Sequence, residues 1–318
     1  MKKSLLLSTA LVAVFAATQA NAFEVKEDVD LNTIFKDGIV KENIWSQTGK
    51  TGTLTVDNIS MSVNGTGVYA NNKSSTINLG NRNGSLQITS NSNMSVFANN
   101  EGEIALKGKN IYVKSALSTI LAIEGGKVNI DGDTVGITSE AKNEYGILAL
   151  ARGEIDVKAK SIDVTSGYAA IHAGNNTTDS KGPFAAINLV GDNVNLLSTA
   201  EDGYAVGAMS QGIVNIDGNT SIKAKEALLA RGNSHININK SGKNTVKMDG
   251  NIDFDYNDKT SKTGVNAYID VTLKGADSYW TGNTVISYDQ KPAADKLEIK
   301  SATINLKDGA TWNATAIT

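Results

Sequence analysis

A short phrase that begins with glycine and continues with alternating polar and apolar residues recurs along the chain. It reads GEIAL at residues 102–106, GKVNI at 126–130, GEIDV at 153–157 and GIVNI at 212–216, with a looser copy, GNSHINI, at 232–238. The steps between neighbouring copies are 24 residues (102 to 126), 27 (126 to 153) and 20 (212 to 232). A repeat of this period indicates a solenoid, because one unit cannot bury its apolar side chains without the units on either side.

Within a unit the apolar residues step by two, which is the period of a strand with one buried side. The unit that follows Gly126 has three such pairs: Val128 and Ile130, Val135 and Ile137, Leu148 and Leu150. Three short strands per turn predict an all-β, right-handed parallel β-helix, a single-stranded solenoid with about ten or eleven rungs, a rung being one turn of the coil. The alternatives are a β-sandwich, which needs hairpin turns, and a propeller, whose blades repeat at about 40 residues or more.

The first 22 residues have the pattern of a signal peptide. Lys2 and Lys3 precede an apolar stretch at residues 5–17, and the small-x-small sequence at 20–22 predicts cleavage before Phe23. The apolar stretch is shorter than the roughly 18–20 residues that span a bilayer. We therefore expect Sec-dependent export.

The repeat divides the remaining chain into two regions. Residues 23–51 lack it and are predicted to form an irregular N-terminal cap with Ile34, Phe35, Ile39 and Trp45 as its apolar content. Residues 52–318 are predicted to be the β-helix. Polar loops are expected at 175–184 and 257–262, and the units become looser from about Lys240.

Composition limits the partners. The chain has 318 residues, no cysteine and a formal net charge of −3. An exported chain without cysteine is stabilised by burial and hydrogen bonding rather than by disulfides. The charge balance gives no polybasic surface, so no nucleic-acid partner is expected.

Two phrases near the end resemble a known family. The sequences ADSYWTGN at 276–283 and NLKDGATWN at 305–313 are similar to the distal passenger segments of pertactin-like bacterial autotransporters. The leader, the absence of cysteine and the repeats are similar too, so the resemblance covers nearly all of the chain after the leader. It implies an adhesin-like passenger on the cell surface or outer membrane, or secreted from the cell.

Autotransporters continue into a C-terminal β-barrel, which reads as alternating strands of about ten residues. The sequence does not contain that pattern. The expectations are a fragment, a truncated gene, or a passenger whose outer-membrane translocator is encoded elsewhere. Without a translocator the protein would stay in the periplasm. An open strand edge at the last rung would favour self-association.

Few residues are candidates for chemistry. His172 and His235 each neighbour an apolar strand residue that points inward, so both are predicted to face solvent, and neither has a partner at metal-ligand spacing. Glu154, Asp156 and Asp163 could line one face beside lysines, as in β-helix enzymes that act on polysaccharides. Alternating polar residues are, however, the normal pattern of a solvated strand. We therefore predict no catalytic, metal or cofactor site and no cofactor.

Short turn sequences resemble ion loops only superficially. The DGD at 131–133 and the DGN at 217–219 offer two ligands each, whereas calcium takes six to eight. They are interpreted as turns. Asparagines in or beside strands, such as Asn129, Asn188 and Asn215, are instead expected to hydrogen-bond from rung to rung.

Tyrosines are the remaining candidates. Tyr69, Tyr145, Tyr168 and Tyr204 recur at the third strand of their units. They could bind sugar rings by stacking, or form a ladder that covers apolar residues. The leading hypothesis is a non-enzymatic surface β-helix that presents an extended surface to host or bacterial glycans or proteins. The alternatives are a polysaccharide lyase or hydrolase and a non-functional passenger fragment.

Overall fold

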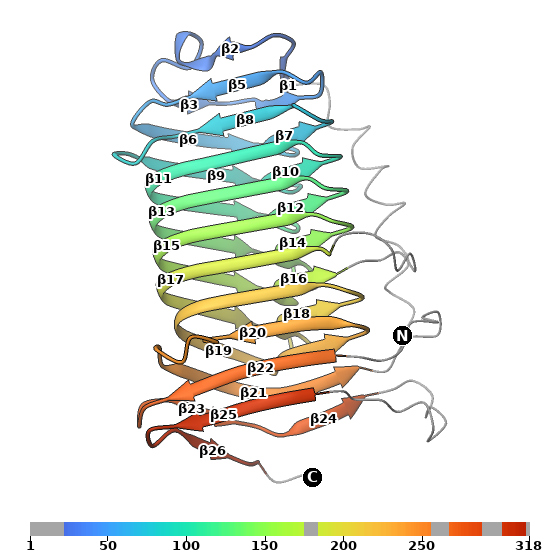
Figure 1. Cartoon of the computed structure of the whole chain (residues 1–318). Helices are drawn as coiled ribbons and strands as arrows, with labels where there is room; N and C mark the ends of the chain where they lie inside the picture. Colours follow the sequence, from blue (N-terminus) through green and yellow to red (C-terminus); the bar gives the residue numbers. More distant parts are fainter. Residues whose placement is uncertain (1–21, 175–183, 256–266, 288–300, 316–318) are drawn as a thin grey trace.

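The computed structural model describes residues 22–174, 184–255, 267–287 and 301–315. Within these ranges the chain winds into a coil of β-strands, each paired in parallel with the equivalent strand one rung away (Figure 1). The predicted parallel β-helix is confirmed. The signal peptide predicted at 1–22 lies outside the described residues except for Ala22.

The strands stack in three faces, and the described residues place eleven strands or parts of strands on each. The first face contains β2 (Val29–Asp30), β5 (Thr51–Leu54), β8 (Thr76–Leu79), the first parts of β11 (Glu103–Ser115), β13 (Lys127–Ser139), β15 (Glu154–Ser166), β17 (Ala186–Ser198) and β19 (Ile213–Arg231), then β20 (Ser234–Ile238), β22 (Ala267–Lys274) and β25 (Ser301–Lys307).

The second face contains β3 (Ile39–Val40), β6 (Asn58–Val63), β9 (Ser85–Ser90), the later parts of β11, β13, β15 and β17, the middle of β19, the first part of β21 (Val246–Asp255), β23 (Tyr279–Thr281) and β26 (Thr311–Asn313). The third face contains β1 (Ala22–Val25), β4 (Asn43–Ser46), β7 (Val68–Asn71), β10 (Val96–Asn99), β12 (Ile120–Ile123), β14 (Tyr145–Leu150), β16 (Ala169–Gly174), β18 (Tyr204–Met209), the ends of β19 and β21, and β24 (Thr284–Ser287).

The core is one continuous column of aliphatic side chains. Alternate residues of every face turn inward, and they form a single cluster that runs from Val25 in β1 to Trp280 in β23. Parallel register places like residues above one another, as with Val68, Val96 and Ile120 on the third face. Burial of each such side chain contributes about 1.5–3 kcal/mol to the free energy of folding, but only if the neighbouring rungs are present.

The repeated glycines stand where the chain leaves the third face. Gly102, Gly126, Gly153 and Gly212 do not have a left-handed backbone, whereas the two residues before each of them do. The glycine is needed for space, because a Cβ would collide with the carbonyl oxygen of an alanine one rung away. The distances from the added Cβ would be: Gly102 to Ala70, 2.4 Å; Gly126 to Ala98, 2.3 Å; Gly153 to Ala122, 2.1 Å; Gly212 to Ala173, 2.0 Å.

The looser fifth copy is shifted relative to the other four. Ile213 pairs with His235, so Ser234 rather than Gly232 occupies the place of Gly212. Gly232 itself is a turn residue with φ of 54°. In the rung before Gly212, Ala185 occupies the equivalent position. This corner position therefore requires a small residue, of which glycine is the most frequent here.

The boundary predicted at residue 51 is not a boundary of the coil. β1, β2, β3 and β4 all lie before it, and they pair in parallel with β4, β5, β6 and β7 respectively. Irregularity is confined to the connections, which include the short 3-10 turn Leu31–Thr33. Of the predicted cap residues Phe35 and Trp45 are buried, whereas Ile34 and Ile39 are about half exposed. The glycine-led repeat did not identify β1 to β4 as part of the coil, because these strands are only two to four residues long.

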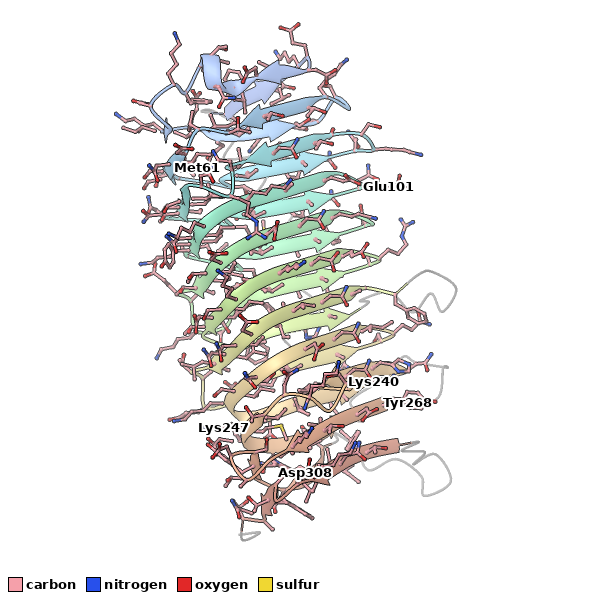
Figure 2. All side chains as sticks on the ribbon, turned by 60° about the vertical axis from the view of Figure 1, so that its left-hand side comes forward. Met61, Glu101, Lys240, Lys247, Tyr268 and Asp308 are labelled. Carbon is pink, nitrogen blue, oxygen red and sulfur yellow. The ribbon has the colours of Figure 1, made fainter. Side chains whose placement is uncertain are left out.

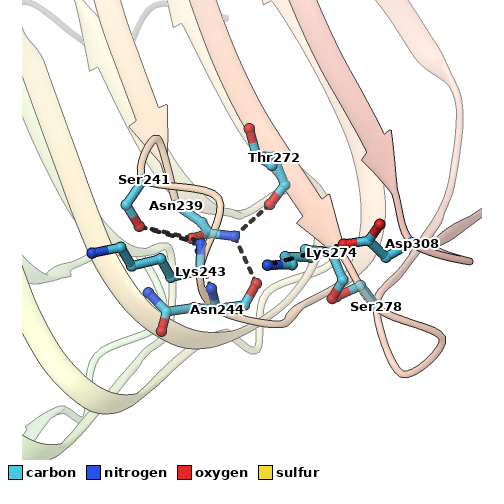
Figure 3. Close-up of polar contacts among 8 residues, drawn as sticks. All are labelled: Asn239, Ser241, Lys243, Asn244, Thr272, Lys274, Ser278 and Asp308. Carbon is cyan, nitrogen blue, oxygen red and sulfur yellow. Dashed lines mark hydrogen bonds and ion pairs between the residues drawn. The ribbon is translucent and has the colours of Figure 1, made fainter.

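The loop that follows β20 is held by one buried asparagine (Figure 3). The Asn239 amide donates to the carbonyl oxygens of Asn244 at 2.6 Å and Thr272 at 2.8 Å. Its side-chain oxygen accepts from the backbone N–H of Lys243 and of Asn244, both at 3.1 Å. The looser sequence after Lys240 is thus an ordered loop fastened to β22. The loops predicted at 175–184 and 257–262 lie outside the described residues except for Phe184.

The two phrases that resemble autotransporter passengers lie on successive rungs. β23 pairs with β26, and Trp280 stands directly over Trp312. Their rings are stacked with centroids 5.0 Å apart. Each indole N–H donates at 2.9 Å to a glycine carbonyl, of Gly250 and Gly282 respectively.

Candidate functional site

The outer side of the third face differs from that of the other two. On the first and second faces the outward residues are mostly polar and at least partly exposed, and their side chains can be followed along the coil in Figure 2. On the third face a row of apolar side chains points outward, here called the outer strip. Its members are Trp45, Tyr69, Phe97, Leu121 and Leu148, one per rung from β4 to β14.

The outer strip is a hydrophobic cluster separate from the core. Its side chains pair in register, and the first three are aromatic. Trp45 meets Tyr69 edge to face at 5.7 Å, and Tyr69 stacks on Phe97 at 5.1 Å. Such pairs add about 0.5–1.5 kcal/mol beyond the area they bury. All five side chains are only 1–6% exposed.

The outer strip continues into a cluster of tyrosines. Tyr145, Tyr168, Tyr204 and His172 lie within ring-contact distance of one another on β14, β16, β18 and the turn before β16. Ring centroids are 5.7 Å apart for Tyr145 and Tyr168, 5.2 Å for Tyr168 and Tyr204, and 5.4 Å for Tyr145 and His172. We call these four residues the tyrosine cluster.

A hydrogen bond organises the tyrosine cluster from inside. The Tyr204 hydroxyl and His172 Nδ1 are 2.5 Å apart. Gly207 makes this contact possible, because a Cβ there would lie 2.3 Å from the Tyr204 ring and 2.9 Å from His172 Nδ1. The sequence gives no signal for this role beyond the spacing of Tyr204 and Gly207 along one strand.

Burial controls the protonation of the tyrosine cluster. It lowers the pKa of His172 to about 3, with a further contribution from the Arg231 charge. Burial also raises the pKa of Tyr145 and that of Tyr204, so both phenols remain protonated. At neutral pH the cluster is therefore an uncharged surface of rings and hydroxyls. Tyr145 and Tyr168 are only partly buried and reach the molecular surface.

Beyond the tyrosine cluster the third face becomes charged. Arg231 and Asp255 form an ion pair at 3.3 Å. Burial raises the pKa of the Glu226 carboxyl, and the nearby Asp253 raises it further. The pKa of Asp253 is likewise raised by burial. The outer side of the third face thus changes along the coil from the outer strip, which begins with three aromatic side chains, through the tyrosine cluster to charged residues.

The structure places the four predicted tyrosines in two groups. Three of the four tyrosines come together, whereas Tyr69 lies three rungs away in the outer strip. The prediction that His172 faces solvent is wrong. His172 does point away from the core, but it is 6% exposed because the rings around it cover it. His235 points outward on the first face, where it stacks on Tyr268 at 4.6 Å.

The three carboxylates considered for catalysis do not converge. Glu154 and Asp156 lie on the first face and Asp163 on the second. Each is engaged by the protein itself: Glu154 pairs with Lys127 at 3.3 Å, and Asp156 and Asp163 accept amide hydrogen bonds at 2.7 Å from the next rung.

A shallow hollow of about 430 Å³ follows the corner between the first and second faces. Its charges pair with one another, as in the contacts of Arg82 with Asp131 at 2.6 Å and of Lys160 with Asp133 at 3.1 Å. The Asp217 carboxylate at the same corner accepts from Asn244 at 2.8 Å. The sequences at 131–133 and 217–219 lie within β13 and β19, so they continue strands around this corner instead of forming the expected turns, and their carboxylates are engaged by contacts within the chain.

The predicted asparagine ladder is present on the first face. Asn188 donates to Asp156 at 2.7 Å, Asn215 to Asn188 at 2.7 Å, and Asn237 to Asn215 at 2.9 Å. All three amides donate toward the N-terminal end, and the row begins with Asp156, whose carboxylate can only accept. Asn129 belongs to the same row, but no side-chain hydrogen bond of Asn129 is found within the described ranges.

In the described ranges, no group of three or more His, Cys, Asp or Glu side chains is placed to hold a metal ion. No helix in the described ranges has the length and apolar character needed to cross a membrane.

Comparison of this chain with protein-family models, with curated proteins and with solved structures yields no match.

Proposed function

We propose that this protein is an exported, non-enzymatic β-helix that presents an extended binding surface, similar to the passenger of an autotransporter. The observation that carries the proposal is the tyrosine cluster on the outer side of the third face, where the partly exposed rings of Tyr145 and Tyr168 lie side by side at 5.7 Å. Rings on neighbouring rungs suit an elongated partner, because the same weak contact can be made at each rung.

The chemistry of the tyrosine cluster favours glycans or proteins of a host or bacterial surface. Tyrosine rings stack on the apolar faces of sugars and of aromatic side chains, and their hydroxyls provide hydrogen bonds. The protonation described above leaves no charge in the cluster that would need a counter-ion. Export through the predicted signal peptide would deliver this surface to the cell exterior if a translocator is present, and to the periplasm otherwise.

A binding experiment tests the proposal. The chain is immobilised, and a panel of neutral and sialylated oligosaccharides and mucin is passed over it. We expect saturable binding that is lost in the double variant Tyr145→Ala/Tyr168→Ala and kept in Tyr112→Ala, whose side chain is exposed on the second face. No saturable binding, or equal binding by both variants, would contradict the proposal.

The same panel tests the enzymatic alternative. After incubation, each oligosaccharide is assayed for new reducing ends and for unsaturated ends. We expect neither. Product that disappears in a Glu154→Gln/Asp156→Asn variant would instead support a polysaccharide lyase or hydrolase.

A further inference from the structure

The asparagine ladder on the first face has a direction, and this direction is interrupted at one step. Every amide in it donates toward the N-terminal end: Asn188 to Asp156, Asn215 to Asn188 and Asn237 to Asn215. Each side-chain oxygen therefore points toward the C-terminal end, where the next rung has to supply a donor. The next asparagine does so for Asn188 and for Asn215. It does not for Asn237.

The residue that follows Asn237 in the row is Asp270 on β22. Its carboxylate can only accept hydrogen bonds, and it accepts one from the Asn305 amide at 3.3 Å. Among the described residues no group donates to the side-chain oxygen of Asn237, and no cation pairs with Asp270. Two acceptors therefore meet at this step, on rungs about 4.8 Å apart.

The meeting of two acceptors follows from the order of residues in the row. An amide has its donors on one side and its acceptor on the other, so a row of amides between two carboxylates can satisfy only one of them. Asp156 is the satisfied end and Asp270 is the other. An acceptor without a donor reduces stability unless a group from outside the chain supplies one. Asn237 and Asp270 are only partly buried, so such a group can reach them.

An aromatic pair lies beside these two acceptors on the same strands. His235 and Tyr268 come two residues before Asn237 and Asp270, so their side chains project from the same side of the face. Their rings are stacked at 4.6 Å with an interplanar angle of 9°, and both are partly exposed. Figure 2 shows Tyr268 on the outside of the coil. No hydrogen bond of its hydroxyl is found within the described ranges.

This combination fits two neighbouring hydroxyls of a sugar. One hydroxyl can donate to the Asn237 oxygen and the other to the Asp270 carboxylate, whose charge strengthens the bond. The apolar part of the same sugar can lie against the Tyr268 ring. A cationic ligand fits less well, because a positive charge is already close. Burial, and after it the Lys240 charge, lower the pKa of His235.

We propose that Asn237, Asp270 and Tyr268 form a second binding site, on the first face, which takes the vicinal diol of a neutral sugar. The bound diol supplies the two donors that the ladder lacks at this step. The inference goes beyond the proposed function, because the site lies on a different face from the tyrosine cluster. Either can fail without the other.

Asp270→Asn tests the site because it completes the ladder. An asparagine at this position can donate to Asn237 and still accept from Asn305, so the two acceptors no longer meet. We therefore expect a higher midpoint of urea unfolding in this variant. Asp156→Asn, the same substitution at the satisfied end of the ladder, is the matched control. It should not raise the midpoint, because an amide oxygen at 156 accepts from Asn188 as the carboxylate does.

Saturation-transfer NMR measures sugar binding by the same variants. The probes are the methyl glycosides of mannose, galactose and glucose in a buffer with EDTA. The chain carries Tyr145→Ala/Tyr168→Ala, so that the tyrosine cluster does not contribute. We expect weak, saturable binding of at least one glycoside, about a tenfold or greater loss when Asp270→Asn or Tyr268→Ala is added, and no loss with Asp156→Asn. Circular dichroism verifies that the coil is folded in each variant.

Four results would overturn the inference. The first is no saturable binding of any of the three glycosides by the folded chain. The second is equal binding before and after Asp270→Asn is added. The third is binding that appears only when calcium replaces EDTA, which would assign the two acceptors to a cation. The fourth is an unchanged or lower urea midpoint in Asp270→Asn, which would show that no donor is missing at this step.

Discussion

His172 shows how a single position departs from the pattern around it. In its row the neighbours are Leu148 one rung before and Gly207 one rung after. A histidine in such a row is stabilised only by a hydrogen bond, which Tyr204 supplies. Because Gly207 lacks a side chain, the Tyr204 ring can reach the imidazole. The polar pair is thus built into an otherwise apolar surface.

Burial of His172 predicts a pH-dependent stability. Its pKa is about 3 in the fold, against about 6.5 in an unfolded chain. Between these values the unfolded state binds a proton that the folded state does not, so the free energy of unfolding falls as pH falls below 6.5. At pH 5 the loss is about 2 kcal/mol.

Urea unfolding at pH 7 and pH 5 measures this loss. The double variant His172→Leu/Tyr204→Phe should lose less stability than the unaltered chain over the same interval, by about 2 kcal/mol. His235→Gln, on the first face, is the control and should keep most of the loss. Identical losses in the unaltered chain and the double variant would show that His172 is not the group responsible.

The sequence predicted some residue roles and missed others. The direction of His172 followed from strand alternation, but its burial depends on the rings of Tyr145 and Tyr204, which come from two other strands. The glycine phrase predicted the glycine at the crowded corner of the rung, as at Gly126. It could not predict that Ala185 and Ser234 fill the equivalent position in other rungs, because the corner requires a small side chain and not one residue type.

Among the elements, the first face owes part of its order to the asparagine ladder. The three amides there are only partly buried; Asn188 and Asn215 both donate and accept along the row, and Asn237 donates to Asn215. Another polar row lies inside the coil, at the corner between the second and third faces. Five buried serines stand there, and turn carbonyls accept from several of them: Ser90, Ser115, Ser139, Ser166 and Ser198.

Asn215→Ala tests the ladder. It removes the hydrogen bonds to Asn188 and from Asn237, and each neutral hydrogen bond contributes about 0.5–1.5 kcal/mol. We expect the free energy of unfolding to fall by about 1–2 kcal/mol. Asn129→Ala in the same row should change it by less than about 0.5 kcal/mol. Equal losses in the two variants would mean that the ladder adds nothing to stability.

Strand alternation predicted the ladder because an outward row follows directly from period two. It could not predict the serine row, since serines near turns are equally common in solvated loops. It also missed β1 to β4, where strands of two to four residues are too short for alternation to be visible. Only the pairing with β5, β6 and β7 reveals them as rungs.

At the scale of the whole molecule, the faces have different outer surfaces. The first and second faces carry ladders and ion pairs that, apart from the step between Asn237 and Asp270, are satisfied within the chain. The third carries the outer strip and the tyrosine cluster, which the strand pattern could not distinguish from core because both sides of those strands are apolar. This asymmetry is the reason for assigning function to the third face.

Thiol labelling tests that assignment most directly. The chain has no cysteine, so Tyr168→Cys, Tyr112→Cys and Ile111→Cys each introduce a single thiol, in the tyrosine cluster, on the exposed second face and in the core respectively. In the folded chain we predict that Tyr168→Cys reacts much faster than Ile111→Cys, at a rate nearer to that of Tyr112→Cys. If Tyr168→Cys reacts as slowly as Ile111→Cys in the folded, monomeric chain, the tyrosine cluster is part of the interior and the third face is not the binding surface.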